Sequence, residues 1–177
     1  MQWVIFTGTW RLTNAEVEND VRGAARHIFE RGDGLVTGGA TGVDYFAMHE
    51  WLKLDPGCKR IRTFIPAKLN HYVADYRKNW KHFPVNDDMI DNLEHILLTM
   101  RERNPQALNE ADIDTGPISQ SMYDLRHADE VANADAVYAF QVNNSTGTKD
   151  TIDKAVAAGL PVLLHKSYRI EETTKHS

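Results

Sequence analysis

The feature that most constrains this chain is a repeated order along the sequence: a short apolar segment, a glycine-containing turn and a helical pattern. In its first copy, a predicted strand at Trp3–Thr7 is followed by Gly8 and then by apolar residues at helical spacing. We expect Thr13 to cap that helix, with Glu16 as its capping-box partner, and Gly32 to end it. Strands and helices in this alternation predict a parallel sheet that is covered by helices on both faces.

Further copies of the same order follow along the chain. The predicted strands are Gly34–Thr37, Arg60–Ile65, Ala136–Phe140 and Val162–His165, and the predicted helices are Val43–Leu54, Ser121–Asn133 and Thr148–Ala158. With the first strand this makes about five strands, and right-handed crossovers between them predict a Rossmann-like, doubly wound α/β sheet. In such a sheet, ligands bind beyond the carboxyl ends of the strands.

The stretch 68–120 interrupts this order. Its first part, His71–Phe83, is rich in aromatic residues and is predicted to be helical, and a second helix with one apolar face follows it. Ala107–Pro117 is polar and is predicted to be a loop. We therefore expect a single domain at 1–170 with a helical insertion at 68–120, and a polar tail at 171–177.

Composition narrows the class of protein. The 177 residues are 42% hydrophobic and carry a formal net charge of −5, which predicts a globular protein without general electrostatic attraction to nucleic acid. Cys58 is the only cysteine, so an intrachain disulfide is impossible and a cytoplasmic location is the simplest expectation. The sequence contains no recognisable targeting segment and no apolar stretch of membrane-spanning length, so we expect no membrane association.

The sharpest local motif is the loop Thr37–Asp44, which follows a predicted strand and opens a predicted helix. A helix N-terminus offers backbone N–H groups without intrahelical partners, and glycine lets the backbone approach an anion closely. Asp44 falls in the first helical turn, where it either binds a ribose hydroxyl or caps the helix. A purely structural turn is the alternative for the whole loop, since it matches neither the dinucleotide fingerprint nor the P-loop. The candidate ligand contacts here are Gly38, Gly39, Thr41, Gly42 and Asp44.

Two further loops are predicted at the same edge of the sheet. Asn143–Asp150 follows the strand Ala136–Phe140 and brings small hydroxyl side chains next to a glycine, which suits a phosphate or a sugar; helix capping is the alternative. The loop after the first strand adds Trp10, for stacking on a base, and Arg11, for a phosphate, although Trp10 is equally suited to packing. The candidate contacts are Thr7, Gly8 and Thr9 in one loop and Ser145, Thr146, Gly147 and Thr148 in the other.

Charged and aromatic residues outside these loops leave open alternatives. Arg126, on the helix before the fourth strand, either points across the ligand edge or forms a surface salt bridge with Asp129 or Glu130. The basic aromatic cluster His71–His82 either binds nucleic acid, covers the ligand edge as a lid, or packs against the core or a partner subunit. The eight histidines show no metal-ligand spacing and no catalytic triad can be assigned, so we predict neither a metal site nor a cofactor.

Taken in order, these motifs resemble the SLOG superfamily of Rossmann-like proteins, which includes the DNA-processing protein A domain and the Lonely Guy, or "lysine decarboxylase-like", phosphoribohydrolases. The resemblance covers residues 2–66 and about 121–165. It is carried by Phe6-Thr7-Gly8-Thr9, by Val36-Thr37-Gly38-Gly39-Ala40-Thr41-Gly42-Val43-Asp44, by Arg126 with Ala134-Asp135-Ala136-Val137-Tyr138-Ala139-Phe140, and by Ser145-Thr146-Gly147-Thr148. It implies a nucleotide-related ligand and makes Arg126 the counterpart of the family's arginine.

The chain departs from the phosphoribohydrolase motif "PGGxGTxxE" in two places. Gly147 and Thr148 match its GT pair, but Asn143, Asn144 and Ser145 stand at the PGG positions, and Thr151 stands where the family has its catalytic glutamate. Asp150 is adjacent, but a helix turns by about 100° per residue, so its side chain does not project to the same point.

These sequence features are compatible with three functions. The first is a nucleotide-binding or nucleotide-sensing module without turnover. The second is an enzyme that acts at the N-glycosidic bond of a nucleotide, with Asp44 or Asp150 as its carboxylate and Arg126 on the phosphate. The third, disfavoured by the net charge, is a single-stranded nucleic acid binder. The apolar and aromatic insertion also leads us to expect a homo-oligomer, most simply a dimer.

Overall fold

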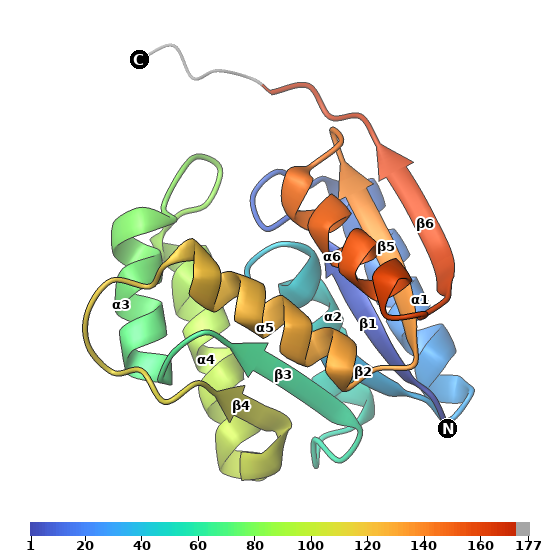
Figure 1. Ribbon diagram of the computed structural model, residues 1–177, viewed down its shortest axis with the longest axis horizontal. Coiled ribbons are helices and arrows are strands. Elements are labelled where there is room, and N and C mark those ends of the chain that lie inside the picture. The colour runs from blue at the N-terminus through green and yellow to red at the C-terminus, as the bar shows by residue number, and fades with distance from the viewer. Residues whose placement is uncertain (173–177) are drawn as a thin grey trace.

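The computed structural model describes residues 1–172, and this part of the chain forms one open sheet of six parallel strands in the order β4-β3-β2-β1-β5-β6 (Figure 1). The fold class predicted from the sequence is confirmed, with six strands in place of about five. The strands are β1 (Trp3–Gly8), β2 (Gly34–Thr37), β3 (Ile61–Ile65), β4 (Leu108–Glu110), β5 (Ala136–Val142) and β6 (Val162–Tyr168).

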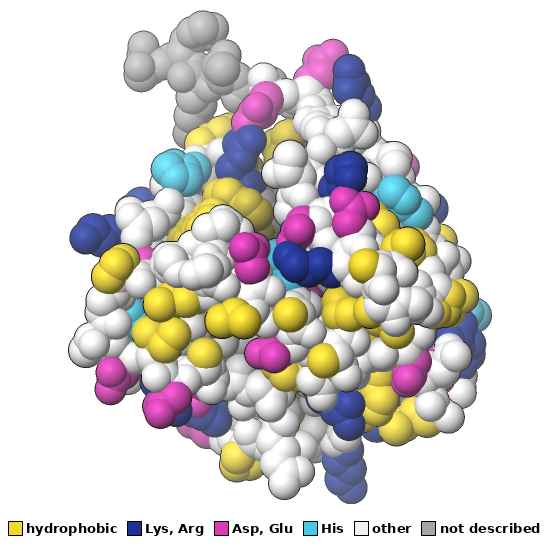
Figure 2. All heavy atoms as spheres, viewed as in Figure 1, with side chains coloured by type: hydrophobic (Ala, Val, Ile, Leu, Met, Phe, Trp, Pro, Cys, Tyr) yellow, Lys and Arg dark blue, Asp and Glu magenta, His cyan; other side chains and the backbone are white. Residues whose placement is uncertain are grey.

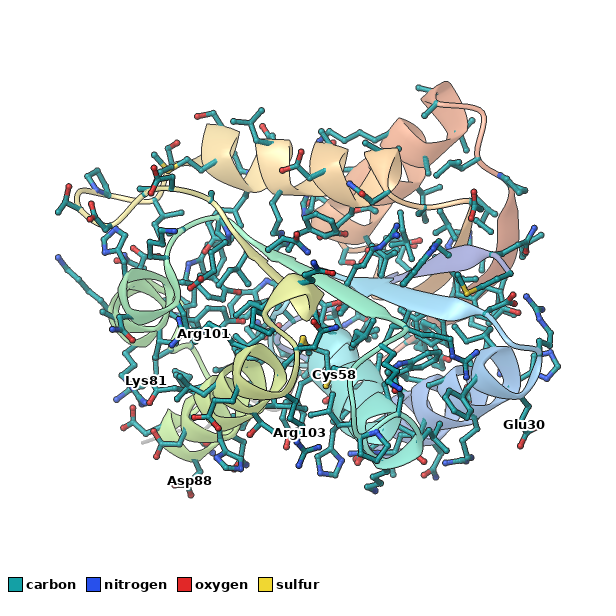
Figure 3. All side chains as sticks on the ribbon, turned by 90° about the horizontal axis from the view of Figure 1, so that it is seen from below. Glu30, Cys58, Lys81, Asp88, Arg101 and Arg103 are labelled. Atoms are coloured by element: carbon teal, nitrogen blue, oxygen red, sulfur yellow. The ribbon has the colours of Figure 1, made fainter. Side chains whose placement is uncertain are left out.

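Helices cover both faces of the sheet, with α1 to α4 on one face and α5 and α6 on the other (Figure 3). They are α1 (Ala15–Glu30), α2 (Val43–Leu54), α3 (Leu69–Asn79), α4 (Asp87–Arg103), α5 (Gln120–Ala132) and α6 (Thr146–Ala157), with a 3-10 turn η1 at Pro105–Ala107. No helix in the described residues is both long and apolar enough to cross a membrane.

The central strand β1 shows why the sheet needs both layers. Val4 and Phe6 are fully buried in the cluster beneath α1 to α4, whereas Ile5 between them is fully buried in the smaller cluster beneath α5 and α6. Successive side chains of a strand point to opposite faces, so a continuous apolar segment requires cover on each side. The strand predicted at Trp3–Thr7 is confirmed, and its uninterrupted apolar run at Val4-Ile5-Phe6 is buried on both faces.

The start of α1 corrects one sequence prediction. Asn14, not Thr13, is the N-cap, and its side-chain oxygen accepts a hydrogen bond from the Val17 amide at 3.0 Å. Asparagine caps helices as well as threonine does, so either residue satisfied the pattern. The capping box expected between Thr13 and Glu16 is therefore wrong.

The stretch 68–120 contains a strand that the sequence did not predict. β4 falls inside the segment expected to be a loop, Ala107–Pro117, and pairs with β3 through Leu108 opposite Thr63. Its three residues are too few to show a strand pattern, and pairing with β3 creates it. Other bounds also differ from the prediction: α3 ends at Asn79 and not near Phe83, β5 continues to Val142, α6 begins at Thr146 and β6 continues to Tyr168.

The strand order creates a switch point beside β1. The chain leaves β1 towards β2, β3 and β4 on one side, and later returns to place β5 and β6 on the other. The loops after β1 and β5 consequently diverge and leave a crevice at the carboxyl ends of the strands, which is where open α/β sheets bind ligands.

Candidate functional site

A pocket of about 870 Å³ lies at this switch point. Figure 2 shows it as a hollow that is lined by hydrophobic side chains and bordered by charged ones. The volume is within the range of small-molecule sites and exceeds what a single phosphate group needs. The walls come from the loop after β1, from α3, from α5 and from the loop that opens α6.

The loop Thr37–Asp44 turns its backbone amides towards the protein. The Ala40 amide donates to the Asp44 carboxylate at 3.1 Å, the Thr41 amide to the Tyr76 hydroxyl at 3.2 Å, and the Val43 amide to the Thr9 carbonyl at 3.0 Å. Asp44 thus takes the place that an anionic ligand was expected to occupy. Of this loop, only Ala40 and Asp44 line the pocket.

The glycines of this loop are required by close packing. The Gly38 carbonyl accepts a hydrogen bond from Arg126 at 2.8 Å, and a Cβ at Gly38 would lie 2.6 Å from a carboxylate oxygen of Glu130. Gly42 has a positive φ of 76°, and a Cβ there would lie 2.3 Å from the Thr9 carbonyl oxygen. Every residue except glycine would clash at these positions.

The loop that opens α6 has the opposite character. Ser145 is the N-cap, but its hydroxyl donates to Thr148 and does not cap a backbone amide. No hydrogen-bond partner within the described residues is recorded for the amides of Thr146, Gly147 and Thr148, and all three residues line the pocket. A Cβ at Gly147 would meet nothing within 4 Å. This helix N-terminus therefore has both the donors and the open space that an anion needs.

The segment at the end of β1 combines features of both loops: it is tightly packed, and it also lines the pocket. Thr7, Gly8 and Thr9 line the pocket, and Gly8 is packed so tightly that a Cβ would lie 2.4 Å from the Val43 side chain. Trp10 and Arg11 also line the pocket. The Arg11 guanidinium already donates to the Phe83 carbonyl at 2.7 Å, so a ligand phosphate would compete with that contact.

Arg126 forms part of the pocket wall on α5, and its side chain is only 10% exposed. Its guanidinium donates to the Gly38 carbonyl and lies 3.4 Å from the Glu130 carboxylate, one helical turn away. The salt bridge to Glu130 that the sequence left open therefore forms, but it is buried and not on the surface. Arg126 Nε and Glu130 Oε1 are the two atoms of this contact, and neither has a further hydrogen-bond partner in the described residues.

Two buried carboxyl groups, Glu130 and Asp44, interact with the positive charge of Arg126. Burial raises the pKa of Glu130 to about 8, although Arg126 pulls it down. Burial also raises the pKa of Asp44 to about 6, against the effect of Arg126 and of the Ala40 amide. The desolvation cost of a carboxylate in this wall thus outweighs its attraction to the one guanidinium nearby.

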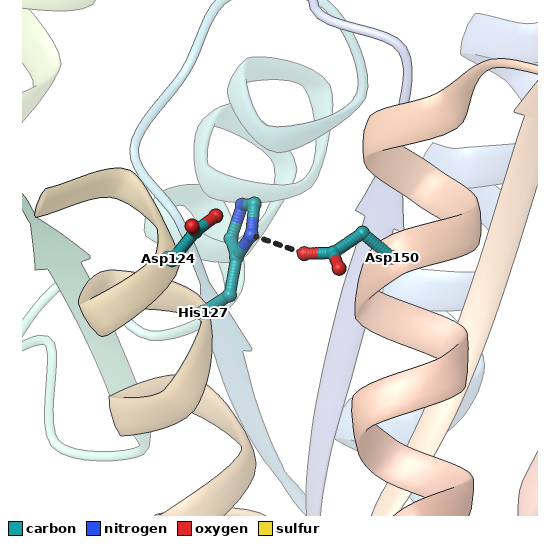
Figure 4. A group of neighbouring side chains, drawn as sticks. All are labelled: Asp124, His127 and Asp150. Atoms are coloured by element: carbon teal, nitrogen blue, oxygen red, sulfur yellow. Dashed lines mark hydrogen bonds and ion pairs between the residues drawn. The ribbon is translucent and has the colours of Figure 1, made fainter. Parts of the chain in front are cut away.

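His127 connects this wall to α6 (Figure 4). Its Nε2 lies 2.9 Å from an Arg126 nitrogen, which can only donate, so Nε2 accepts and the proton is on Nδ1. Nδ1 in turn lies 3.3 Å from the Asp150 carboxylate. Burial and the adjacent Arg126 lower the pKa of His127 to about 4, which keeps the imidazole neutral. Asp150 thus orients His127, which holds the guanidinium of Arg126.

Asp124, His127 and Asp150 place one potential metal-ligating atom each within 4.8 Å of one another (Figure 4). Lys154 forms ion pairs with both carboxylates, at 3.8 Å to Asp124 and in closer contact with Asp150. A cation at this position would have to displace the ammonium group. The group is therefore charge-compensated by the protein itself.

The predicted basic aromatic cluster His71–His82 divides into two parts. Tyr72, Tyr76 and Trp80 line the pocket. The basic residues Arg77 and Lys81 instead form ion pairs with Asp91 and Asp87 of α4. The cluster thus presents aromatic rings, and not these cations, to the ligand edge.

The comparisons with known proteins show the fold. DNA processing protein A from Helicobacter pylori, whose solved structure is described for its single-stranded DNA binding mode, matches with a TM-score of 0.64 and 19% identity over 99% of this chain and 68% of the other. The structural-genomics target TM1055 matches with a TM-score of 0.54 and 15% identity over 92% of this chain and 72% of the other. No protein-family model and no curated protein matches the chain.

Among the pocket residues that were not assigned to the site from the sequence are Tyr123, His127 and Glu130. All three lie on α5 with Arg126, and their spacing of three or four residues was the available signal. The sequence treated Glu130 only as a surface partner, because nothing in the spacing shows that this side of α5 faces a crevice.

Proposed function

We propose that this protein binds a nucleotide or nucleotide-derived phosphate ligand in the switch-point pocket, as a binding module without turnover. The observation that carries the proposal is the N-terminus of α6, whose amides at Thr146 to Thr148 have no recorded partner in the described residues and face a pocket that Arg126 also lines. Backbone donors, the helix dipole and a fixed guanidinium together favour a phosphate ester over a neutral ligand.

The lack of turnover is supported by Thr151. Its hydroxyl donates to the Gly147 carbonyl at 3.3 Å, and the residue is buried beside the proposed phosphate site. A hydroxyl engaged in this way supplies neither the charge nor the proton that a glutamate would bring to an N-glycosidic bond. Asp150, the nearest carboxylate on α6, is ion-paired with Lys154.

Gly147→Asp tests the proposal. A carboxylate at the start of α6 suits the helix dipole and meets no steric obstacle, so the fold should keep its stability while phosphate is repelled. We expect nucleoside mono- and diphosphates to raise the Tm of the wild type but not of Gly147→Asp. Gly57→Asp, an exposed turn position preceding β3, makes the same charge change away from the pocket and should respond like the wild type. Equal shifts in all three proteins, or none in the wild type, would refute the proposal.

A second candidate is hydrolysis at the N-glycosidic bond, and the buried pair Asp44 and Glu130 favours it. Two carboxyl groups whose environments separate their pKa values are a common arrangement of general acid and base. Release of free base from nucleoside monophosphates, followed by chromatography, would support this candidate. Unchanged release in Asp44→Asn and in Asp44→Ala combined with Asp150→Ala would rule out the carboxylates assigned from the sequence.

Single-stranded nucleic acid remains the third candidate, because the Helicobacter pylori neighbour is described as binding single-stranded DNA. The pocket rim here carries Asp124, Asp150 and Asp153, each ion-paired with Lys149 or Lys154, so these residues add no net positive charge that would attract a polyanion. Oligonucleotide binding that weakens steeply with added salt would favour it. The predicted homodimer and cytoplasmic location stay predictions.

A further inference from the structure

We propose that the pocket contains a ring-stacking subsite for a nucleobase, formed by Trp10 and Trp80 and positioned by the insertion helix α3. The inference deepens the proposed function, on which it rests: α6 would take the phosphate and the aromatic wall the base. Figure 1 shows α3 and α6 on either side of the sheet edge where the pocket lies.

The wall is a connected set of rings from three separate parts of the chain. Trp80 contacts Trp10 at 5.1 Å and Tyr123 at 5.3 Å between ring centroids, both edge to face. Tyr76 joins the set at 6.2 Å from Trp80 and 6.5 Å from Trp10. All four residues line the pocket, and the two tryptophans are only partly buried while the tyrosines are buried. A ligand would therefore meet the tryptophans first.

The buried tyrosines Tyr72 and Tyr76 connect this wall to the loop Thr37–Asp44, whose backbone groups are hydrogen-bonded within the protein. The Tyr72 hydroxyl donates to the Gly39 carbonyl at 2.9 Å, and the Tyr76 hydroxyl lies 2.7 Å from the Thr41 hydroxyl. These contacts fix α3 relative to the sheet edge, so the rings are held in place before a ligand arrives. Aromatic side chains held in this way provide contact area at little cost in conformational entropy.

Polar side chains beside the rings indicate the chemistry of the ligand. Gln120, Asp124 and Glu130 lie on α5 with Tyr123, and all four residues line the pocket. A ring that binds here therefore needs donors and acceptors of its own. A flat apolar face with polar groups along its edge is the description of a nucleobase, and stacking on aromatic side chains tolerates any of the four.

The test compares nucleoside 5′-monophosphates with ribose 5-phosphate, which lacks only the base, in wild type and Trp80→Leu. By titration calorimetry, we expect Trp80→Leu to weaken nucleotide binding about 10-fold, the size of one stacking contact, and to change ribose 5-phosphate binding less than about 2-fold. Trp3→Leu, on β1 with its ring under Arg62, makes the same change outside the pocket and should leave both affinities unaltered.

Tryptophan fluorescence of the wild type tests the subsite independently, in case Trp80→Leu fails to fold. Nucleotides should quench tryptophan fluorescence and ribose 5-phosphate should not. Trp80→Phe, which retains a ring, should bind nucleotides within about 3-fold of the wild type. The subsite is ruled out if ribose 5-phosphate binds as tightly as the nucleotides, or if Trp80→Leu weakens both ligands equally. If no phosphate compound binds, the proposed function falls together with the subsite, whereas phosphate binding without a contribution from the base overturns the subsite alone.

Discussion

The loops Thr37–Asp44 and Asn143–Asp150 occupy equivalent places, each after a buried strand and before a helix, but they differ in whether their backbone amides are hydrogen-bonded within the protein. In the first, amides and carbonyls are bonded to other parts of the protein, and Asp44 takes the position of an anion. In the second, the helix N-terminus faces the pocket with its amides unpaired by the described residues. Glycine in a strand-to-helix turn therefore has two uses, close packing and close approach by a ligand, and only the neighbouring residues decide between them.

The largest expected effect concerns Arg126, which holds the closed loop through the Gly38 carbonyl. Arg126→Met leaves the Glu130 and Asp44 carboxylates buried without their shared cation, so we expect the free energy of unfolding to fall by about 3–5 kcal/mol at pH 9, where both are ionised in the wild type. Urea denaturation measures this change. Adding Glu130→Leu to Arg126→Met should restore most of the loss. A loss below about 1 kcal/mol in the single variant would show that the pair is not buried.

The glycines test the comparison most directly. Gly42→Ala forces a Cβ against the Thr9 carbonyl at a positive φ, and we expect a loss of roughly 2–4 kcal/mol. Gly147→Ala adds a methyl group to open space in a helix, so stability should stay the same or rise by up to about 1 kcal/mol. Both are read from the urea midpoint. Similar losses in the two variants would mean that both loops are closed.

The pH dependence of stability provides a third test. The pKa of Glu130 is raised in the folded protein from 4.5 to about 8, so the unfolded chain loses this proton first and stability falls as pH rises through that interval. Two other groups affect stability only at lower pH. Asp44 has a folded pKa of about 6, so its contribution is lost around that pH. His127 has a folded pKa lowered to about 4, so stability rises with pH from about 4 up to its unfolded pKa of 6.5. Between pH 6.5 and 8, Glu130 therefore dominates.

In that window we expect the wild type to lose at most about 2 kcal/mol of unfolding free energy. Glu130→Gln, which has no proton to lose, should be nearly flat over the same range. Urea denaturation at pH 6.5 and at pH 8 gives both values. A wild type as flat as Glu130→Gln would indicate that Glu130 is charged in the fold throughout.

The smallest effect separates the N-caps of α1 and α6. Asn14 accepts a hydrogen bond from the Val17 amide, so Asn14→Ala should cost about 1 kcal/mol. The Ser145 hydroxyl bonds Thr148 and caps no amide, so Ser145→Ala should cost only about 0.5 kcal/mol. Thermal melts of the two variants resolve this difference. A larger loss at Ser145 would mean that its side chain does satisfy the helix terminus.

Much of the fold could be predicted because it depends on short-range patterns. The apolar runs at Val4–Phe6 and at Ala136–Phe140, each followed by a turn and a helix, predict two strands of a parallel sheet. In the structure they form the neighbouring strands β1 and β5. β4 was missed because three residues carry no pattern of their own and become a strand only through pairing with β3. The inward face of α5 was missed because periodicity shows that a helix has a face, but not what that face meets.

Apart from β4, the sequence alone determined the order of elements and the placement of both glycine loops at one edge of the sheet, since hydrophobic periodicity and backbone freedom are local properties. Which loop stays open was decided by the tertiary structure. The partners that close the first loop come from far along the chain: Tyr72 is 33 residues from Gly39, and Arg126 is 88 residues from Gly38. A hydrogen-bond donor becomes available to a ligand only where the fold brings no other acceptor to it, and that depends on every element packed around the site.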